Sequence, residues 1–332
     1  MVVLLYAGFG LLPIAALFPA TALLGLIGLL AMARRASVPF RPRLAEVNWA
    51  SLKQVWGFAS LTFVEDTLTL WFLQVNSFLA AKLLPLPDLA ILAVARRFPQ
   101  ALTDLSVQTL VVAYPMVASA AARKDQPALE RFLMIATRNI LALMLPIAAA
   151  LFVWAEVILR LWIGGDVLAG VPVFKALLFF AVFAGLQDVP LNLLYGVGKI
   201  RFSAALSGVL LAAAIGVGAW ACAHYGLIGL AVSYAAIQMA GTVLLYAYSL
   251  RFVQIPFRHW LRKAVAPNLW PALATILWFW ISSRAVAHNL VGLTISTAIG
   301  FVLFFTLFAG LVGGSQKQPW KTRVRRLLTE ID

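Results

Sequence analysis

The chain has 332 residues, of which 63% are hydrophobic and only 11% are charged, and its mean hydropathy is +0.95. This composition excludes a water-soluble globular protein, because such proteins need about 25% charged residues to cover their surface. The net charge of +14 would indicate nucleic-acid binding in a soluble protein. Here most basic residues lie in short loops between apolar runs, which indicates membrane topology and no nucleic-acid partner.

The apolar runs predict an all-α fold, a polytopic membrane helical bundle. Each run has about 20 residues, the length that a helix needs to cross the hydrocarbon core. The runs also lack the period-two alternation of a membrane β-barrel. Nine transmembrane helices are predicted, at residues 12–32, 57–80, 89–118, 132–154, 173–195, 203–223, 227–249, 266–285 and 290–312.

The first residues do not resemble a signal peptide, because residues 1–10 are apolar and no Lys or Arg precedes them. We expect an upstream span to be missing. Prolines within or beside predicted spans each predict a kink, which serves either as a hinge or as a static bend. These prolines are Pro13, Pro115, Pro146 and Pro190.

The loop charges predict an orientation. Alternate loops and the basic tail at 313–332 together carry most of the 26 Lys and Arg residues. Because cytoplasmic loops are enriched in Lys and Arg, we expect the C-terminus in the cytoplasm. The segment WASLKQVWGF at 49–58 predicts an amphipathic interfacial helix that leads into the second span and contacts membrane lipids.

Polar residues recur at helical spacing on three predicted spans. On the second span the stripe is Thr62, Asp66, Thr69 and Asn76, with Glu65 on its shoulder. On the third it is Arg97, Gln100, Asp104 and Gln108, with Arg96 adjacent. The fifth span adds Gln187, Asp188 and Asn192. Because the turn from Leu83 to Asp88 is short, we expect the second and third spans to lie side by side with their stripes in contact.

Each charged residue in a span costs roughly 2.5 to 3.5 kcal/mol at the centre of the membrane, so these residues must face protein, water or one another. Three interpretations are open. In the first, Asp66 and Asp104 pair with Arg96 and Arg97 only to fix the packing of the helices. Alternatively, the arginines line a water-filled cavity and attract an anionic head group, with the carboxylates as their partners when it is empty. Finally, a carboxylate such as Glu65, Asp66 or Asp188 exchanges H+ or Na+.

Catalytic and metal signatures are weak. His224, His259 and His288 lie near predicted span ends without Cys or carboxylates at metal-binding spacing, so no metal site is predicted. Cys222 is the chain's one cysteine, which excludes an intrachain disulfide. We expect a protein that is not an enzyme and holds no cofactor, apart from coupling to H+ or Na+.

The order of several motifs resembles a known family. These motifs are AYPMVASAAARKD at 113–125, ALERFLMIATR at 128–138, EVILRLWIGGD at 156–166, GVGKIRF at 196–202 and HYGLIGLAVSYAAIQ at 224–238. Together they resemble the polysaccharide-biosynthesis flippases of the MOP superfamily, over most of residues 45–250. The strongest motif is the proline-containing end of the third span with the basic loop that follows it.

The resemblance implies a carrier of two six-helix lobes that moves lipid-linked oligosaccharide across the bacterial inner (plasma) membrane by alternating access. It assigns 1–45 to a remnant of the first lobe with a cytoplasmic linker, and 46–250 to a MATE-like second lobe. Two extra transmembrane helices and the basic tail would occupy 251–332. We therefore expect an N-terminally truncated flippase, whose partner is a missing N-terminal lobe or a polysaccharide-assembly protein. The family's cationic cavity would fall on Arg96 and Arg97.

Other functions stay open at this stage. A drug or cation antiporter of the same superfamily would depend on the carboxylates instead of the arginines. An inactive flippase fragment would carry no substrate. A polysaccharide polymerase or ligase is disfavoured, because such enzymes usually present a large outer loop and the predicted outer loops here are short.

Overall fold

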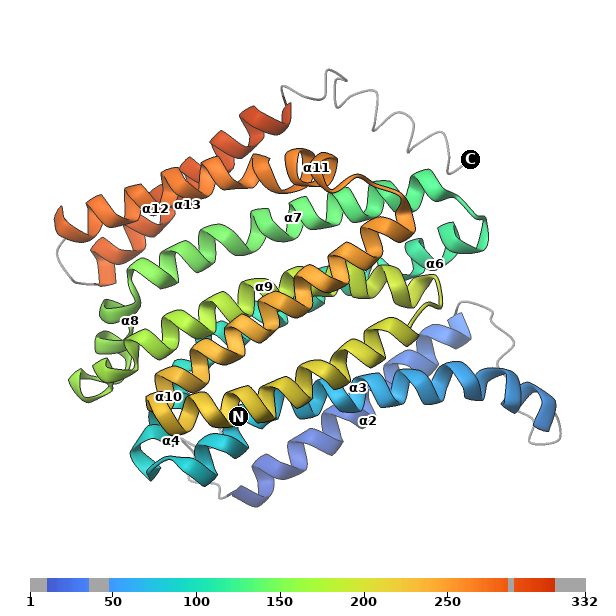
Figure 1. The fold of residues 1–332 in the computed structure, drawn as a ribbon, viewed down its shortest axis with the longest axis horizontal. Helices are drawn as coiled ribbons and strands as arrows, with labels where there is room; N and C mark the ends of the chain where they lie inside the picture. The colour runs from blue at the N-terminus through green and yellow to red at the C-terminus, as the bar shows by residue number, and fades with distance from the viewer. Residues whose placement is uncertain (1–10, 36–47, 286–289, 314–332) are drawn as a thin grey trace. The chain divides into compact units, whose positions relative to one another are not determined.

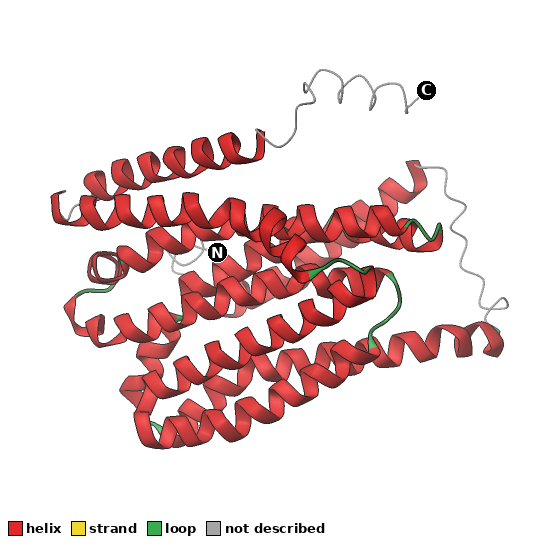
Figure 2. Cartoon of the chain, turned by 45° about the horizontal axis from the view of Figure 1, so that its top comes forward, coloured by secondary structure: helices red, strands yellow, loops and turns green. Residues whose placement is uncertain are grey.

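The structure is a computed structural model that describes residues 11–35, 48–285 and 290–313. All regular structure in these ranges is helical (Figures 1 and 2). Two compact units are present, residues 1–57 and residues 58–332. Helix α2 (Leu11–Arg35) lies in the first unit, and α3 (Trp49–Leu83) begins there and continues into the second. The predicted interfacial segment 49–58 is thus the first part of α3.

The remaining helices all belong to the second unit. In chain order they are α4 (Leu86–Ala95), α5 (Arg97–Val111), α6 (Tyr114–Ala122), α7 (Gln126–Val153), α8 (Ala155–Trp162), the 3-10 helix η2 (Gly165–Gly170), α9 (Val171–Gly196), α10 (Arg201–Val253), α11 (Phe257–Trp260), the π-helix η3 (Leu261–Val265), α12 (Ala266–Ala285) and α13 (Leu290–Gly313).

Five helical segments in the described ranges are long and apolar enough to cross a membrane, and a bent pair of segments adds a sixth. The five correspond to α7, α9, α10, α12 and α13, with bounds that extend slightly beyond some of these helices. The prediction of an all-helical membrane protein is confirmed, while the full number of nine spans stays a prediction.

Helix α10 contains two of the predicted spans. Its 53 residues are interrupted at Gly226, whose φ of 61° and ψ of −148° are not helical. At this point the chain reverses, so that the two halves of α10 form a hairpin (Figure 1). Only glycine adopts such a conformation readily, because it has no Cβ. The predicted boundary between the spans 203–223 and 227–249 is therefore confirmed.

Prolines divide the predicted third span into α4, α5 and α6. Pro99 cannot donate a hydrogen bond to the carbonyl of Ala95, and α4 ends at Ala95. Pro115 has the same relation to Val111, the last residue of α5, and the chain bends by 41° before α6. The kink at Pro115 is thus confirmed, but the sequence analysis missed the break at Pro99. Pro146 and Pro190 lie inside α7 and α9 without interrupting them.

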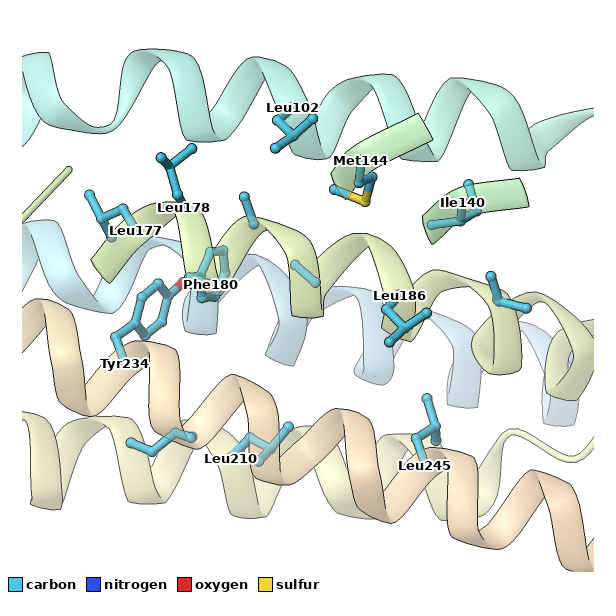
Figure 3. Close-up of a cluster of buried hydrophobic side chains, with 14 of the residues drawn as sticks. Leu102, Ile140, Met144, Leu177, Leu178, Phe180, Leu186, Leu210, Tyr234 and Leu245 are labelled. Carbon is cyan, nitrogen blue, oxygen red and sulfur yellow. The ribbon is translucent and has the colours of Figure 1, made fainter. Parts of the chain in front are cut away.

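The core of the second unit surrounds α9, which packs against α10, α5, α7, α6 and α4. Helix α9 is apolar on nearly all sides, as a central helix must be. Figure 3 shows Phe180 of α9 beside Tyr234 of α10, and their rings stack with centroids 4.3 Å apart. The Tyr234 hydroxyl donates a 3.1 Å hydrogen bond to the Phe72 carbonyl of α3, which links α3 to this core.

Helices α12 and α13 pack against each other and against α7 (Figure 1). The side chain of Phe279 on α12 is fully buried beside Trp154, and Phe304 on α13 is fully buried beside Ala142 of α7. The Trp278 indole donates a 3.0 Å hydrogen bond to the Ser296 carbonyl, which joins α12 to α13. This pair of helices therefore adds a second layer outside α7.

Three buried side chains, one each from α7, α10 and α11, form a polar cluster that supports a stability prediction. The hydroxyls of Thr137 and Tyr246 lie 2.9 Å apart, and the Trp260 indole approaches Thr137 at 3.5 Å. Thr137→Val should lower the free energy of unfolding by about 1 to 3 kcal/mol, because both partners lose a buried hydrogen bond. The measurement is the thermal unfolding midpoint of the purified protein.

The control for this substitution is Thr306→Val, since the exposed Thr306 bonds only to carbonyls of its own helix. The double variant Thr137→Val with Tyr246→Phe should recover part of the lost stability, because it removes the Tyr246 hydroxyl, one of the two groups left without a hydrogen-bond partner. Equal midpoints for Thr137→Val and Thr306→Val would contradict the role given to Thr137.

Candidate functional site

The break at Pro99 determines where the two candidate arginines lie. Arg96 occupies the junction between α4 and α5, and Arg97 is the first residue of α5. The Arg96 backbone N–H still bonds to the Leu92 carbonyl, so the chain direction changes little at this point. Both arginines line one cavity.

We call this space the arginine cavity. It has a volume of about 670 Å³, within the range usual for ligand pockets. Besides apolar side chains of α4, polar residues of α3 and α5 line it, namely Gln74, Ser77, Arg96, Arg97 and Gln100. The cavity thus combines two permanent positive charges with neutral hydrogen-bonding groups.

The two arginines differ in their surroundings. The half-buried Arg96 donates a 3.0 Å hydrogen bond to the Leu73 carbonyl and a 3.3 Å bond to the Ser77 hydroxyl, so α3 fixes its guanidinium. Arg97 is exposed, and its side chain forms no hydrogen bond or ion pair with the part of the chain that the structure describes. Arg97 is therefore available to a ligand, while Arg96 is held in place.

Several other predicted site residues lie close to the arginine cavity or farther along α5. The buried Asn76 lines a small adjoining pocket together with Arg96, Gln100 and Tyr234. The Gln100 amide donates a 2.8 Å hydrogen bond to Asp104, which is exposed, and Gln108 is exposed as well. Of the predicted α5 stripe, only Arg97 and Gln100 line the cavity.

A second group, the carboxylate cluster, consists of Glu65, Asp66, Thr69, Tyr195 and Ser207. Glu65 is 2% exposed and accepts hydrogen bonds from Tyr195, Ser207 and Thr69, which come from α9, α10 and α3. Asp66 is exposed and lies 3.3 Å from the Tyr195 hydroxyl. In the described ranges, no group of three or more His, Cys, Asp or Glu is arranged to hold a metal ion.

The predicted residues of α9 form a third group in the C-terminal half of that helix. Asp188 accepts a 3.1 Å hydrogen bond from the buried Ser106 of α5. Gln187 accepts bonds from Gln238 and Thr242 of α10, at 3.1 and 3.3 Å. The Asn192 amide donates to the Asp188 carbonyl one turn earlier. These contacts join α9 to α5 and α10, so they stabilise the core of the second unit.

The structure corrects two sequence predictions about the charges. Among the described residues, neither Asp66 nor Asp104 forms an ion pair with Arg96 or Arg97. The reason is partly distance along α3: Asp66 and Ser77, the partner of Arg96, are eleven residues apart, or about 16 Å of helix. The orientation of α3 also differs from the prediction, because Glu65 is buried and Asp66 is exposed.

Several polar residues of these groups were not predicted from the sequence. They are Gln74, Ser77, Thr103, Ser106, Tyr195, Ser207, Gln238 and Thr242. Two signals could have revealed some of them. Tyr195 follows Asp188 by seven residues, which places both on one face of a helix. Gln238 and Thr242 are four residues apart in an otherwise apolar run.

Comparisons with known proteins agree with this architecture. The family described as "Polysaccharide biosynthesis protein" matches residues 1–172, slightly more than half of the chain. A solved structure described as "Lipid II flippase MurJ, inward closed conformation" is similar with a TM-score of 0.58 and 17% sequence identity.

That similarity covers 75% of this chain and 51% of the MurJ chain, so the present chain spans about half the length of MurJ. A comparison with curated protein sequences finds no significant match. The family match includes the motifs at 113–138 that carry the predicted resemblance. The chain therefore belongs to the polysaccharide biosynthesis protein family, and its helices adopt a MurJ-like membrane fold.

Proposed function

We propose that this protein moves a lipid-linked oligosaccharide across the bacterial inner membrane, with an undecaprenyl pyrophosphate group between sugar and lipid. The family membership and the MurJ-like fold support a role in polysaccharide biosynthesis. The observation that carries the proposal is that Arg96 and Arg97 line the same cavity of a membrane protein. Charged residues within membrane-spanning segments are costly and therefore rare, and those that occur usually serve a function.

The arginine cavity suits a pyrophosphate because of its chemistry. A guanidinium group donates two parallel hydrogen bonds to phosphate oxygens and keeps its charge at any physiological pH. Arg97 would bind the phosphate directly, and Arg96 would add a fixed positive charge at its anchored position beside Ser77. Gln74 and Gln100 offer hydrogen bonds to the neighbouring sugar. The lipid tail would stay in the bilayer.

Transport of this kind needs no covalent chemistry. It needs two conformations that differ in which side of the membrane the charged head group can reach. We propose that the C-terminus is cytoplasmic and that the opposite wall of the arginine cavity belongs to a first lobe. This lobe would resemble the part of MurJ that the alignment does not cover.

The direct test is reconstitution into liposomes that contain a labelled undecaprenyl pyrophosphate-linked sugar. The proposal expects saturable movement of this lipid between the leaflets, and much slower movement of the same lipid with an uncharged linkage. The measurement is the fraction of label that an impermeant enzyme or quencher reaches over time. Equal rates for the two lipids would contradict the proposal, because the arginines would then have no role in selection.

A second candidate function rests on the carboxylate cluster. A cation antiporter would use Glu65 and Asp66 as its binding groups, and a flippase could use them to couple transport to H+ or Na+. The burial of Glu65 among three hydrogen-bond donors favours a role in coupling. Tyr195 connects the cluster to α9, so a change of charge at Glu65 would affect the contact between α3 and α9.

Glu65→Gln provides the corresponding prediction. The amide keeps the shape of the side chain but holds no negative charge, so an imposed pH or Na+ gradient should no longer accelerate transport. Movement without a gradient should persist at a rate within about threefold of the original protein, a difference of less than 1 kcal/mol. The measurement is the ratio of rates with and without a gradient in the same liposomes.

The matched control is Glu156→Gln. Glu156 is an exposed carboxylate that pairs with Arg160 at 2.8 Å on α8, far along the chain from the carboxylate cluster. Its substitution should leave the response to the gradient intact. An undiminished response in Glu65→Gln would rule out a coupling role for this carboxylate.

A further inference from the structure

A second large cavity lies on another part of the lobe. It has a volume of about 620 Å³ and is lined by α5, α6 and α7. We call it the α6–α7 groove. Its lining shares no residue with that of the arginine cavity, and no function discussed so far uses it.

The groove exists because of the local sequence. The break before Pro115 bends α6 away from the axis of α4 and α5 by 41°. Small side chains on both sides then leave the space between α6 and α7 unfilled. These are Ala113, Ser119, Ala120, Ala128 and Ala136. Larger residues such as Leu129, Phe132 and Ile140 form the floor and walls, which are therefore mostly apolar.

Positive charge is concentrated at one end of the groove. Arg123 follows α6 directly, and Arg131 lies in the second turn of α7. The Arg131 Nε donates to the Pro127 carbonyl at 3.3 Å, which leaves its outer N–H groups available. The Arg123 side chain forms no hydrogen bond or ion pair with the described part of the chain. Both residues are exposed.

The acidic residues nearby do not cancel this charge in the groove. Asp125 is engaged at the start of α7, where its carboxylate accepts a 3.0 Å hydrogen bond from the Ala128 N–H. Glu130 is half-buried and does not line the groove. The groove therefore presents two guanidinium groups at its end and an apolar surface along its length.

We propose that the α6–α7 groove binds an anionic phospholipid of the surrounding membrane. Arg123 and Arg131 hold the phosphate, and one acyl chain lies along the apolar wall. The dimensions agree with this occupant. From Leu129 to Ile140 the wall extends over eleven residues, or about 16 Å of helix, and one leaflet of the hydrocarbon core is about 15 Å thick. The binding is independent of the arginine cavity.

The first test changes the charges. The purified protein is mixed with phosphatidylglycerol in detergent, and native mass spectrometry measures how many lipid molecules it retains. Arg123→Gln with Arg131→Gln should weaken retention about thirtyfold, since each basic residue at an anionic surface contributes about fivefold. Retention of zwitterionic phosphatidylcholine should not change. The matched control is Lys199→Gln with Arg201→Gln, an exposed basic pair at the start of α10.

The second test fills the groove and keeps its charges. Ala136→Phe places a ring against the apolar wall and should displace the acyl chain, which would lower phosphatidylglycerol retention at least tenfold. Ala212→Phe, at an exposed position of α10 outside the groove, is the control. The thermal unfolding midpoint of each variant shows whether it folds, and the single variant Arg123→Gln replaces the double one if that variant does not fold.

The proposal stands if both sets of substitutions weaken retention and both controls do not. Equal losses from the arginine pair and the Lys199–Arg201 pair would overturn it, because binding would then reflect surface charge in general. An unchanged retention in Ala136→Phe would overturn it too, since the groove would then hold no acyl chain. A dimer mass in place of a lipid adduct, lost on Ala136→Phe, would assign the groove to a second copy of the chain instead.

Discussion

Replacing Arg97 with Glu is expected to lower the rate of pyrophosphate-linked sugar movement at least a hundredfold. Arg97 lines the arginine cavity and has no partner within the described residues, so the substitution should leave the fold intact. It removes two charge-assisted hydrogen bonds to phosphate and adds a repulsive charge, and each such bond contributes about 1.5 to 3 kcal/mol. The measurement is kcat/KM for transport in liposomes.

Two further variants show which property of Arg97 is needed. Arg97→Lys keeps the positive charge but loses the planar fork, so its rate should fall between those of Arg97 and Arg97→Glu. Arg201→Glu reverses an exposed charge on α10 outside the arginine cavity and should leave the rate unchanged. Normal lipid transport in Arg97→Glu would contradict the flippase proposal. Cation exchange that Asp66→Asn abolishes, without any movement of the lipid, would favour the cation antiporter instead.

The helical spans were largely predictable because their signal is simple. Apolar runs of membrane length and the glycine at 226 are visible in the sequence, and they give the hairpin of α10 almost to the residue. The break between α4 and α5 was not predicted. Pro99 lies in an apolar run that is long enough to span the membrane in spite of its polar residues, so composition alone treats α4 and α5 as one helix. Only the missing hydrogen bond to Ala95 divides them.

The candidate site was less predictable, because helical spacing does not fix which side of a helix faces the core. Glu65 and Asp66 are adjacent, so a shift of 100° decides which one is buried, and the apolar residues around them do not favour either. In the structure Glu65 is buried because Tyr195 and Ser207 supply hydrogen bonds from two other helices. Such partners are 130 and 142 residues away in the chain, and no local pattern indicates them.

The arginine pair shows the converse case. Arg96 and Arg97 were predicted to line one cavity because they are adjacent in the sequence. Two neighbours on a regular helix, however, point about 100° apart. The junction at Arg96 and the long reach of both side chains allow them to line one cavity. Their separation from the carboxylates follows from the length of α3, which places Glu65 about 18 Å of helix from Ser77. The arginine cavity and the carboxylate cluster are thus distinct sites.

Replacing Gly229 with Ala is expected to destabilise the α10 hairpin by about 3 kcal/mol, near the upper end for overpacking a tight contact. A Cβ at this position would lie 2.3 Å from the Ala221 carbonyl oxygen and 2.6 Å from the Tyr225 Cβ. The first of these is a backbone atom of the opposite half of the hairpin, so it cannot move aside as the end of a side chain would. The two halves would have to separate, and the contacts of Phe72 and Phe180 with Tyr234 would weaken with them.

The thermal unfolding midpoint of the purified protein measures the effect. Gly216→Ala on the same helix is the control, because a Cβ there meets no atom within 4 Å and alanine favours the helix by up to about 1 kcal/mol. A midpoint for Gly229→Ala as high as that for Gly216→Ala would mean that the hairpin does not depend on this close approach.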